Sequence, residues 1–532
     1  MNQDVTQALS HTNFSIVDVT IVVFYLLISL LIGLMVRRYA RNMAAYIGAG
    51  RKVGTWLGVA TMMGTEMGLI TVMYSAQKGF TGGFAAFHIA VIAGVTTLLI
   101  GVSGFIVVPL RKLKVLTIPE YYEKRFDRKT RVLGGIMLAF AGILNMGLFL
   151  KVGSIFLVGI TGLSNSGIAL PLIMIALLAL VLIYTMCGGM ISVILTDYVQ
   201  FVVLSIGLLM VTIMAIIKLG WGHIFSTVAA GMGDAGFNPL IEESGFGWSY
   251  VAWMFITAGL VGSAVWPTAV ARALAMKNTQ AVRRNYMWSS ISFTVRFMIP
   301  NFLGICAFVY ITASPEAADL KKLFLPGHGL EGFDNLYAMP VFLGRLIPPV
   351  FIGVITAAMT AAFMSTHDSY FLCWSSVITQ DIIAPLCKNG LSEKRRVTLT
   401  RWIILLIGLY VLYWGLFYPG NDDIWDYMAV TGAIYFSGAV AVLVGGIYWK
   451  KASRTGAFAS LLAGFSAILG LQPVQMTLGM QSLNITTGKI EPILSSATAG
   501  LCSIGLVFTV MIVCSILFPD KTGKAEISPR KT

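Results

Sequence analysis

Two stretches of this chain place charged and hydroxyl side chains inside otherwise apolar sequence. The first, GVATMMGTEMGLITVMYSAQKG at residues 58–79, holds Glu66 between Gly64 and Gly68. Glycines so close together weaken a helix, and a helix unwound within a membrane frees backbone carbonyls to coordinate a cation. Small residues can instead serve close helix packing, but the glutamate between them favours a functional break.

The second stretch, residues 354–382, combines small and hydroxyl side chains with Asp368. Ser365 and Ser369 are four residues apart and share one face of a helix, with Ala362 one turn earlier. Hard cations prefer oxygen ligands, whereas a lone hydroxyl more often bonds back to its own helix. A cluster of hydroxyls beside a carboxylate therefore predicts a cation site.

Further titratable residues inside apolar segments are Lys151, Asp197, Arg296 and His367. A charge at the centre of a bilayer is unfavourable by at least about 2.5–3.5 kcal/mol, so each needs a partner or a function. We expect these side chains to contact an ion, a solute or one another.

The elements that must position these side chains are membrane-spanning helices. Hydrophobic residues make up 57% of the 532 positions and charged residues 11%, compared with about 25% charged in soluble domains. Thirteen apolar segments follow one another, at 16–36, 54–77, 84–110, 132–162, 167–187, 190–217, 250–271, 286–313, 346–383, 401–418, 424–449, 455–477 and 492–518. The prediction is an all-α integral membrane protein with about thirteen transmembrane helices in the lipid bilayer.

Basic residues set the predicted orientation. They concentrate in one set of loops, at 37–52, 111–131, 272–284, 388–401 and 450–454 and in the C-terminal tail. We therefore expect the N-terminus outside and the C-terminus in the cytoplasm, in the plasma membrane (the inner membrane of a bacterium). The net charge of +14 then reports topology, and no nucleic-acid partner is expected. The long outer loops, 219–249 and 314–345, are expected to form short surface helices.

Several motifs, in order along nearly the whole chain, resemble those of the solute:sodium symporter family, which includes sodium/proline permeases, sodium/glucose cotransporters and sialic-acid transporters. They are YIGAGRKVGTW, TIPEYYEKRF, GGMISVILTDYVQ, AAFMSTHDSYFLCWSSVITQDI and IYWKKASRTGAF, with Ala49 in place of a usual glycine. The resemblance implies a LeuT-type core of two inverted five-helix repeats, 46–218 and 250–449. Residues 1–45 are then a peripheral leading span, 219–249 an outer loop, and 450–532 two peripheral spans and a short tail.

The resemblance also implies the ion sites. The principal sodium site falls on carbonyls of Gly64, Met67 and Ala362 and on hydroxyls of Ser365 and Thr366. A second sodium site falls on Asp197, Ser365, Asp368 and Ser369. Asp368 departs from the family's usual hydroxyl residue, so this site binds sodium more tightly or holds a shared proton. His367 keeps proton coupling open, although a packed, satisfied histidine is the commoner case.

The solute is less defined. The Glu-Gln pair of the sugar-transporting relatives is replaced by Ile70 and Thr71, which disfavours a sugar. Lys151 matches a cation that meets a substrate carboxylate in sialic-acid-type members, but it can also pair with Glu66 or extend to the membrane surface. The predicted solute-binding residues are Glu66, Gly68, Thr71, His88 and Lys151.

Together these features predict a secondary transporter that couples a small organic solute, carboxylate-bearing or zwitterionic, to Na+, with more than one ion expected. The alternatives are proton-coupled symport through Asp197, Asp368 and His367, and a transporter-fold sensor. No HExxH, GxSxG or catalytic Cys/His arrangement is present, so an enzyme is not expected. No obligate protein partner is evident.

Overall fold

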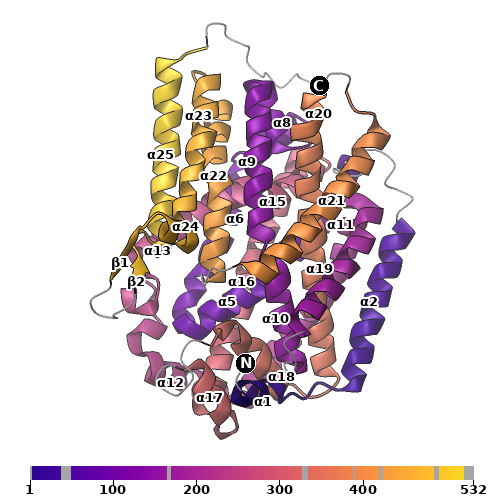
Figure 1. Ribbon diagram of the computed structural model, residues 1–532, viewed down its shortest axis with the longest axis vertical. Helices are drawn as coiled ribbons and strands as arrows, with labels where there is room; N and C mark the ends of the chain where they lie inside the picture. The colour runs from indigo at the N-terminus through magenta and orange to yellow at the C-terminus, as the bar shows by residue number, and fades with distance from the viewer. Residues whose placement is uncertain are drawn as a thin grey trace.

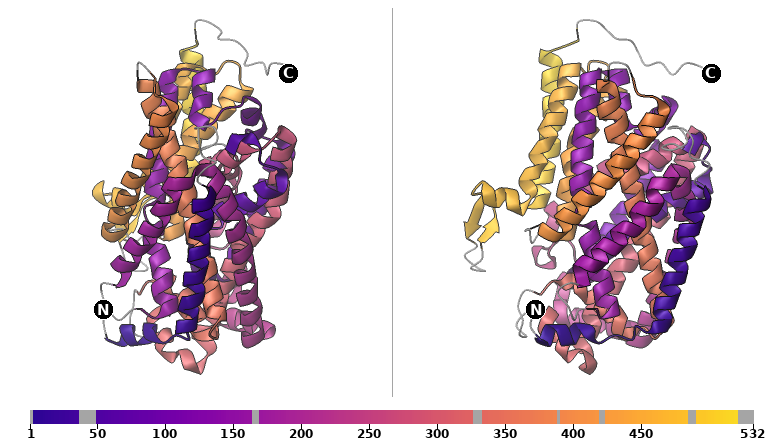
Figure 2. Two further views of the ribbon diagram at one scale, coloured as in Figure 1. Left: turned by 90° about the vertical axis from the view of Figure 1, so that its right-hand side faces the viewer. Right: turned by 45° about the vertical axis from the view of Figure 1, so that its right-hand side comes forward.

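The computed structural model describes residues 3–36, 49–163, 169–325, 333–387, 390–418, 423–483 and 490–520. These residues form a bundle whose helices run mainly along its longest axis (Figures 1 and 2). The first half contains α1 (Gln3–Ser10), α2 (Ile16–Val36), α4 (Thr55–Glu66), α5 (Leu69–Gly82), α6 (Phe87–Ser103), α7 (Val107–Lys112), α8 (Ile118–Arg125), α9 (Arg128–Met146), α10 (Phe149–Thr161), α11 (Ala169–Leu219) and α12 (Trp221–Met232).

The second half contains α13 (Gly247–Trp253), a π-helix at Met254–Val261, α14 (Gly262–Val265), α15 (Pro267–Ala275), α16 (Thr279–Ala313), α17 (Ala318–Phe324), α18 (Ala338–Leu346), α19 (Phe351–Val377) with its π-helical extension Ile378–Ile383, α20 (Ala384–Leu386), α21 (Glu393–Phe417), α22 (Ile424–Tyr448), α23 (Arg454–Gly464), α24 (Gln472–Thr477) and α25 (Ser496–Leu517). A short antiparallel hairpin, β1 (Gln481–Leu483) and β2 (Ile490–Pro492), was not predicted.

Two helices are interrupted. Between α4 and α5, Met67 (φ −91°, ψ 63°) and Gly68 leave the helical conformation, which confirms the predicted break. Between α14 and α15, Trp266 (φ −58°, ψ 120°) precedes Pro267, which has no N–H to continue the helical ladder. The second break was not predicted. These interrupted helices are the first helices of the two expected repeats.

Residues 169–219 form one helical element, α11, although the sequence predicts two spans, 167–187 and 190–217. Within its 51 residues, Ala169–Ile183 and Val193–Leu219 are two separate apolar stretches. In the described part of the chain, eight helices are long and apolar enough to cross a membrane by length and composition, and three shorter apolar helices accompany them. The count of thirteen spans stays a prediction.

The connecting helices separate to the two ends of the bundle. Figure 1 shows α1, α12, α17 and α18 at one end and α8 and α20 at the other. Short surface helices were predicted in the two long loops, and α12 and α17 confirm this prediction. Helix α18, also from the second loop, is instead buried along almost its whole length. Helices α2 and α25 stand at opposite edges of the bundle in Figure 1 and in the right-hand view of Figure 2.

Helix α16 packs closely against α5 and α6, and α19 packs against α11. The crossing of α5 and α16 brings backbone against backbone: a Cβ on Gly79 would lie 1.9 Å from the Asn301 carbonyl oxygen, and one on Gly304 would lie 1.9 Å from the Ala76 carbonyl oxygen. Small residues permit this approach, as is common where helices associate in membranes. The crossing therefore fixes the position of α5, the helix that begins directly after the break.

Candidate functional site

The break between α4 and α5 lies against the hydroxyl-rich face of α19. Thr366 donates its hydroxyl to the Thr65 carbonyl oxygen at 3.2 Å. A Cβ on Gly68 would lie 2.1 Å from Thr366 Oγ1, so only glycine permits this contact. The break is therefore held against α19 by a hydrogen bond and by the absence of a side chain.

Helix α4 also contacts α11 at the same level. A Cβ on Gly64 would lie 3.1 Å from the Asp197 carbonyl oxygen. All five residues of the predicted principal sodium site are buried at this junction of α4, α11 and α19: Gly64, Met67, Ala362, Ser365 and Thr366. The structure thus brings the two predicted stretches together, with carbonyl and hydroxyl oxygens on facing elements.

The Asp197 carboxylate is fully buried and surrounded by donors. It accepts hydrogen bonds from Thr61 at 2.6 Å, from Thr65 at 3.1 Å and from Ser365. The Arg272 guanidinium lies 3.6 Å from it. Such a shell fixes the carboxylate in one orientation.

Arg272 corrects a sequence-based assignment. The sequence places it in a cytoplasmic loop, but α15 holds it in the interior with 1% of its surface exposed. Its Nη2 donates to Thr65 Oγ1 at 2.6 Å and to Ser369 Oγ at 2.5 Å. The α14–α15 break turns this helix inward, a long-range effect that charge counting does not detect.

A chain of contacts joins the two aspartates of the predicted second ion site. Ser369 accepts from Arg272 and donates to Asp368 at 3.1 Å. The network therefore runs from Asp197 through Arg272 and Ser369 to Asp368. With both carboxylates ionised, the two aspartates and the one guanidinium of this chain of contacts sum to a formal charge of −1. Buried charge of one sign is unfavourable, so the region attracts a further cation.

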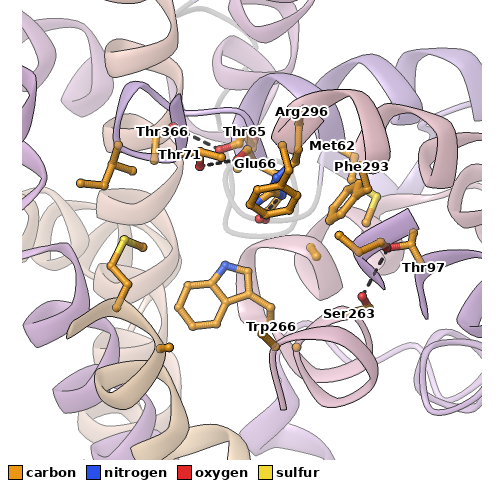
Figure 3. Close-up of a pocket in the computed structure, with 18 of the residues that line it drawn as sticks. Met62, Thr65, Glu66, Thr71, Thr97, Ser263, Trp266, Phe293, Arg296 and Thr366 are labelled. Carbon is orange, nitrogen blue, oxygen red and sulfur yellow. Dashed lines mark hydrogen bonds and ion pairs between the residues drawn. The ribbon is translucent and has the colours of Figure 1, made fainter. Parts of the chain in front are cut away.

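A cavity of about 140 Å³ lies on the other side of the α4 terminus, and Glu66 and Arg296 lie on its wall (Figure 3). Arg296 Nη1 is 3.3 Å from Glu66 Oε2, and Thr268 donates to Glu66 Oε1 at 2.6 Å. Eight aromatic side chains line it as well: Tyr74, Trp266, Tyr286, Phe293, Phe297, Tyr370, Trp425 and Phe436. Its polar lining includes Thr65 and Thr366, so the cavity adjoins the predicted sodium site. A small aromatic cavity with one charge pair is a typical ligand site, although smaller than the 300–1,000 Å³ usual for drug-sized ligands.

Only some of the predicted solute residues reach this cavity. Glu66 and Thr71 line it, and Thr71 donates to the Glu66 carbonyl at 3.0 Å. Gly68 instead lies under Thr366 at the break. His88 does not line the cavity; its Nδ1 is 2.7 Å from the Ala85 carbonyl oxygen, and its ring packs on Phe246.

Lys151 also lies outside the lining. It is half-buried on α10, and its Cβ faces Gly415 of α21. The predicted alternative, a pair with Glu66, does not form, because Glu66 pairs with Arg296. The cation at the cavity wall is therefore Arg296, which the sequence marked only as a charge within a span.

His367 fits the packed alternative. Its ring lies among Phe149, Phe363 and Phe371, with centroids 3.9 Å apart for the Phe363 pair. Its Nδ1 is 2.8 Å from the Phe363 carbonyl oxygen. This environment is apolar and turns the ring towards aromatic side chains.

Interrupted helices that meet a hydroxyl-rich helix beside a small cavity are typical of secondary transporters. The model of the sodium:solute symporter family matches residues 46–464, and the chain belongs to that family. It is 23% identical over 485 residues to a sodium/glucose cotransporter of Vibrio parahaemolyticus, covering 87% of this chain and 86% of the relative. It is 23% identical over 459 residues to a sodium/proline symporter of Staphylococcus aureus, covering 84% of each.

The solved structure of a sodium-coupled sialic acid symporter superposes with a TM-score of 0.76 at 19% identity, covering 96% of this chain and 100% of that one. The predicted LeuT-type fold is thereby confirmed. As a member of its family, the chain is a sodium-coupled secondary transporter of a small-molecule solute and not an enzyme.

Proposed function

We propose that this transporter carries a small carboxylate-bearing or zwitterionic solute into the cell together with sodium, by alternating access. We place it in the plasma membrane, the inner membrane of a bacterium, with its N-terminus outside and its C-terminus in the cytoplasm. Residues 46–218 and 250–449 are the inverted repeats, and residues 219–249 are the outer loop between them. Residues 1–45 and 450–532 are peripheral.

The observation that carries the proposal is the contact between the helix break and α19, where Thr366 bonds to the Thr65 carbonyl. We assign the principal sodium ion to carbonyls of Gly64, Met67 and Ala362 and to the hydroxyls of Ser365 and Thr366. Hard cations prefer such oxygens. The net negative charge of the neighbouring network, Asp197–Arg272–Ser369–Asp368, supports a cation here.

We place a second sodium ion on Asp197, Ser365, Asp368 and Ser369. A side chain of the protein itself competes with this ion. Arg272 contacts both Asp197 and Ser369, so its guanidinium and an ion compete for the same oxygens. We propose that the second site fills only when Arg272 withdraws. Ion number then depends on the conformation of α15.

The charge pair at the cavity supports the proposed solute. Glu66 and Arg296 are 3.3 Å apart and both line the cavity. A zwitterion offers a carboxylate to Arg296 and a cationic group to Glu66. It therefore replaces their mutual contact without leaving a buried charge unpaired. A neutral sugar offers no such exchange.

The test is uptake into proteoliposomes with and without a sodium gradient, using a panel of amino acids, carboxylates and sugars. Ser365→Ala and Thr366→Ala should each abolish sodium-driven uptake. Thr360→Ala is the matched control, because this buried hydroxyl of the same helix bonds back to the Thr356 carbonyl at 2.8 Å. Unchanged sodium dependence in both site variants, or equal loss in the control, would contradict the assignment.

Proton coupling through Asp197, Asp368 and His367 is the second candidate, and the proximity of two carboxylates to one network favours it. Against it, His367 lies among phenylalanine rings. Uptake driven by a pH gradient without sodium would select the proton mechanism. A transporter-fold sensor, the third candidate, would bind the solute without flux.

A further inference from the structure

A groove of about 890 Å³ runs between the first turn of α4 and one face of α16, away from the cavity and the ion site. Its walls include Trp56, Trp288 and Ile291, and its basic residues are Lys277 and Arg284. The positive-inside pattern assigns this end of α16 to the cytoplasmic side of the membrane. None of these residues has a role in the proposed transport reaction.

The side chains that line the groove change in type along the axis of α16. Arg284, Trp288 and Ile291 occupy positions i, i+4 and i+7 of α16, so they share one helix face. Trp288 lies about 6 Å and Ile291 about 10 Å further along the helix axis than Arg284, at 1.5 Å per residue. A basic group is thus followed by an aromatic ring and then by an aliphatic side chain, from the membrane surface inwards.

The aromatic level is formed by two elements. The rings of Trp56 and Trp288 have centroids 5.6 Å apart and an interplanar angle of 39°. Both are strongly exposed on the bundle, Trp56 with 69% and Trp288 with 49% of its surface. Tryptophan prefers the level of the lipid headgroups and esters, because its ring is apolar and its N–H is polar.

The basic residues of the groove, Lys277 and Arg284, form its basic level. The side chains of Lys277 and Arg284 are exposed, and within the described part of the chain neither forms an ion pair. Of the described residues that line the groove, none is acidic. Basic pockets between transmembrane helices on the cytoplasmic side are suited to anionic headgroups.

We propose that this groove binds an anionic phospholipid, with its phosphodiester between Lys277 and Arg284 and an acyl chain along Trp56, Trp288 and Ile291. A free phosphate ion would use the basic level but gain nothing from the apolar walls. A zwitterionic phospholipid would fill the walls but gain less at the basic level. The bound lipid rests against the first turn of α4, the helix whose other end carries the ion site.

The experiment measures lipid binding to the purified full-length transporter by native mass spectrometry, with phosphatidylglycerol, phosphatidylcholine or inorganic phosphate added. The test variant is Lys277→Ala/Arg284→Ala. The matched control is Lys394→Ala/Arg395→Ala, which removes two exposed basic residues at the start of α21, on the same expected side of the membrane. A second variant, Trp288→Ala, removes the aromatic wall and leaves the charge unchanged.

We expect wild type and control to bind one phosphatidylglycerol more tightly than phosphatidylcholine. The double groove variant should bind phosphatidylglycerol about 30-fold more weakly, which corresponds to about 2 kcal/mol for two basic residues. Trp288→Ala should weaken both lipids, and phosphate should bind much more weakly than phosphatidylglycerol. Equal affinity for both lipids in the wild type, or an unchanged phosphatidylglycerol affinity in the groove variant, would mean ordinary surface lipid and overturn the proposal. Phosphate binding as tight as that of phosphatidylglycerol would also overturn it.

Discussion

Thr65 and Glu66 are consecutive residues at the end of α4, yet their side chains belong to two different buried networks. Thr65 joins the ion-side network, where it donates to Asp197 and accepts from Arg272. Glu66 joins the solute-side network, where it meets Arg296 and Thr268 at the cavity wall. Both networks centre on a carboxylate and an arginine, but their surroundings differ.

The two networks differ in charge and in saturation. The ion-side carboxylate, Asp197, is enclosed by three hydroxyl donors and one guanidinium, and with Asp368 its network keeps a formal charge of −1. The solute-side pair of Glu66 and Arg296 is formally neutral and borders open space. A saturated, negative network suits a small cation, whereas a neutral pair at a cavity suits a partner that brings its own charges.

Breaking the ion-side network should have the largest effect. Asp197→Asn leaves the Arg272 guanidinium buried without its carboxylate, and removing one partner of a buried pair typically destabilises by about 3–5 kcal/mol. We expect a strongly lowered melting temperature of the purified transporter and no sodium-driven uptake. Asp197→Asn/Arg272→Gln should recover much of the thermal stability but not the uptake. If the double variant were as unstable as the single one, charge pairing would not be the cause.

The solute-side network should respond differently to the equivalent change. Arg296→Gln should weaken solute binding by at least about tenfold, because a charge-assisted contact contributes roughly 1.5–3 kcal/mol. The stabilisation of the protein by sodium, measured as a shift in melting temperature, should remain. Loss of the sodium response in Arg296→Gln, but not in Ser365→Ala, would reverse the assignment of the two networks.

Local patterns made one part of this site predictable. The break follows from Gly64 and Gly68, and the hydroxyl face of α19 follows from residues spaced by four. Both signals lie within a few residues of the feature that they predict. The all-helical fold follows equally from the length and apolar character of the segments.

The rest depended on contacts between distant elements. Lys151 and Arg296 are both single charges in apolar segments, and only packing decides which one faces the cavity. Helix α10 turns Lys151 towards α21, while α16 presents Arg296 to Glu66. Arg272 is buried because of the break at Pro267, a residue that the sequence-based segment 250–271 contained without any indication of its effect.

Glycine substitutions test the close backbone contacts at the helix break, which lies between the two networks. Gly68→Ala places a Cβ 2.1 Å from Thr366 Oγ1, whereas Gly64→Ala places one 3.1 Å from the Asp197 carbonyl oxygen. Overpacking in a close contact typically destabilises by about 1–3 kcal/mol, so Gly68→Ala should lower sodium affinity more than Gly64→Ala. Sodium titration of uptake gives the comparison.

A carboxylate–arginine pair at the proposed outer end, Asp319 and Arg345, gives the comparison a half-exposed reference and the smallest expected effect. Arg345 Nη1 donates to Asp319 Oδ1 at 2.9 Å, while the Asp319 side chain is 40% exposed. Burial by itself raises the pKa of Asp319. The hydrogen bonds and the positive charge of Arg345 lower it by more, so the pKa lies below its ordinary value. A lowered carboxyl pKa stabilises the folded state above the unfolded pKa of about 3.9, and this contribution disappears as the pH falls through the native value.

Asp319→Asn should therefore lower the melting temperature slightly at pH 7, by the equivalent of less than about 1 kcal/mol for a solvent-screened pair. The difference from wild type should narrow as the pH falls below the unfolded pKa of about 3.9, and it should close once the pH has fallen through the lower native pKa, where the wild-type carboxyl is protonated as well. Asp234→Asn, at an exposed acidic residue within 219–249, is the control for the removal of one surface carboxylate. A deficit that stays constant down to pH 3 would show that Asp319 stabilises α17 and α18 through packing. The half-exposed pair of Asp319 and Arg345 would then differ from the buried pairs, because its charges would contribute nothing to stability and its side chains would act only through packing.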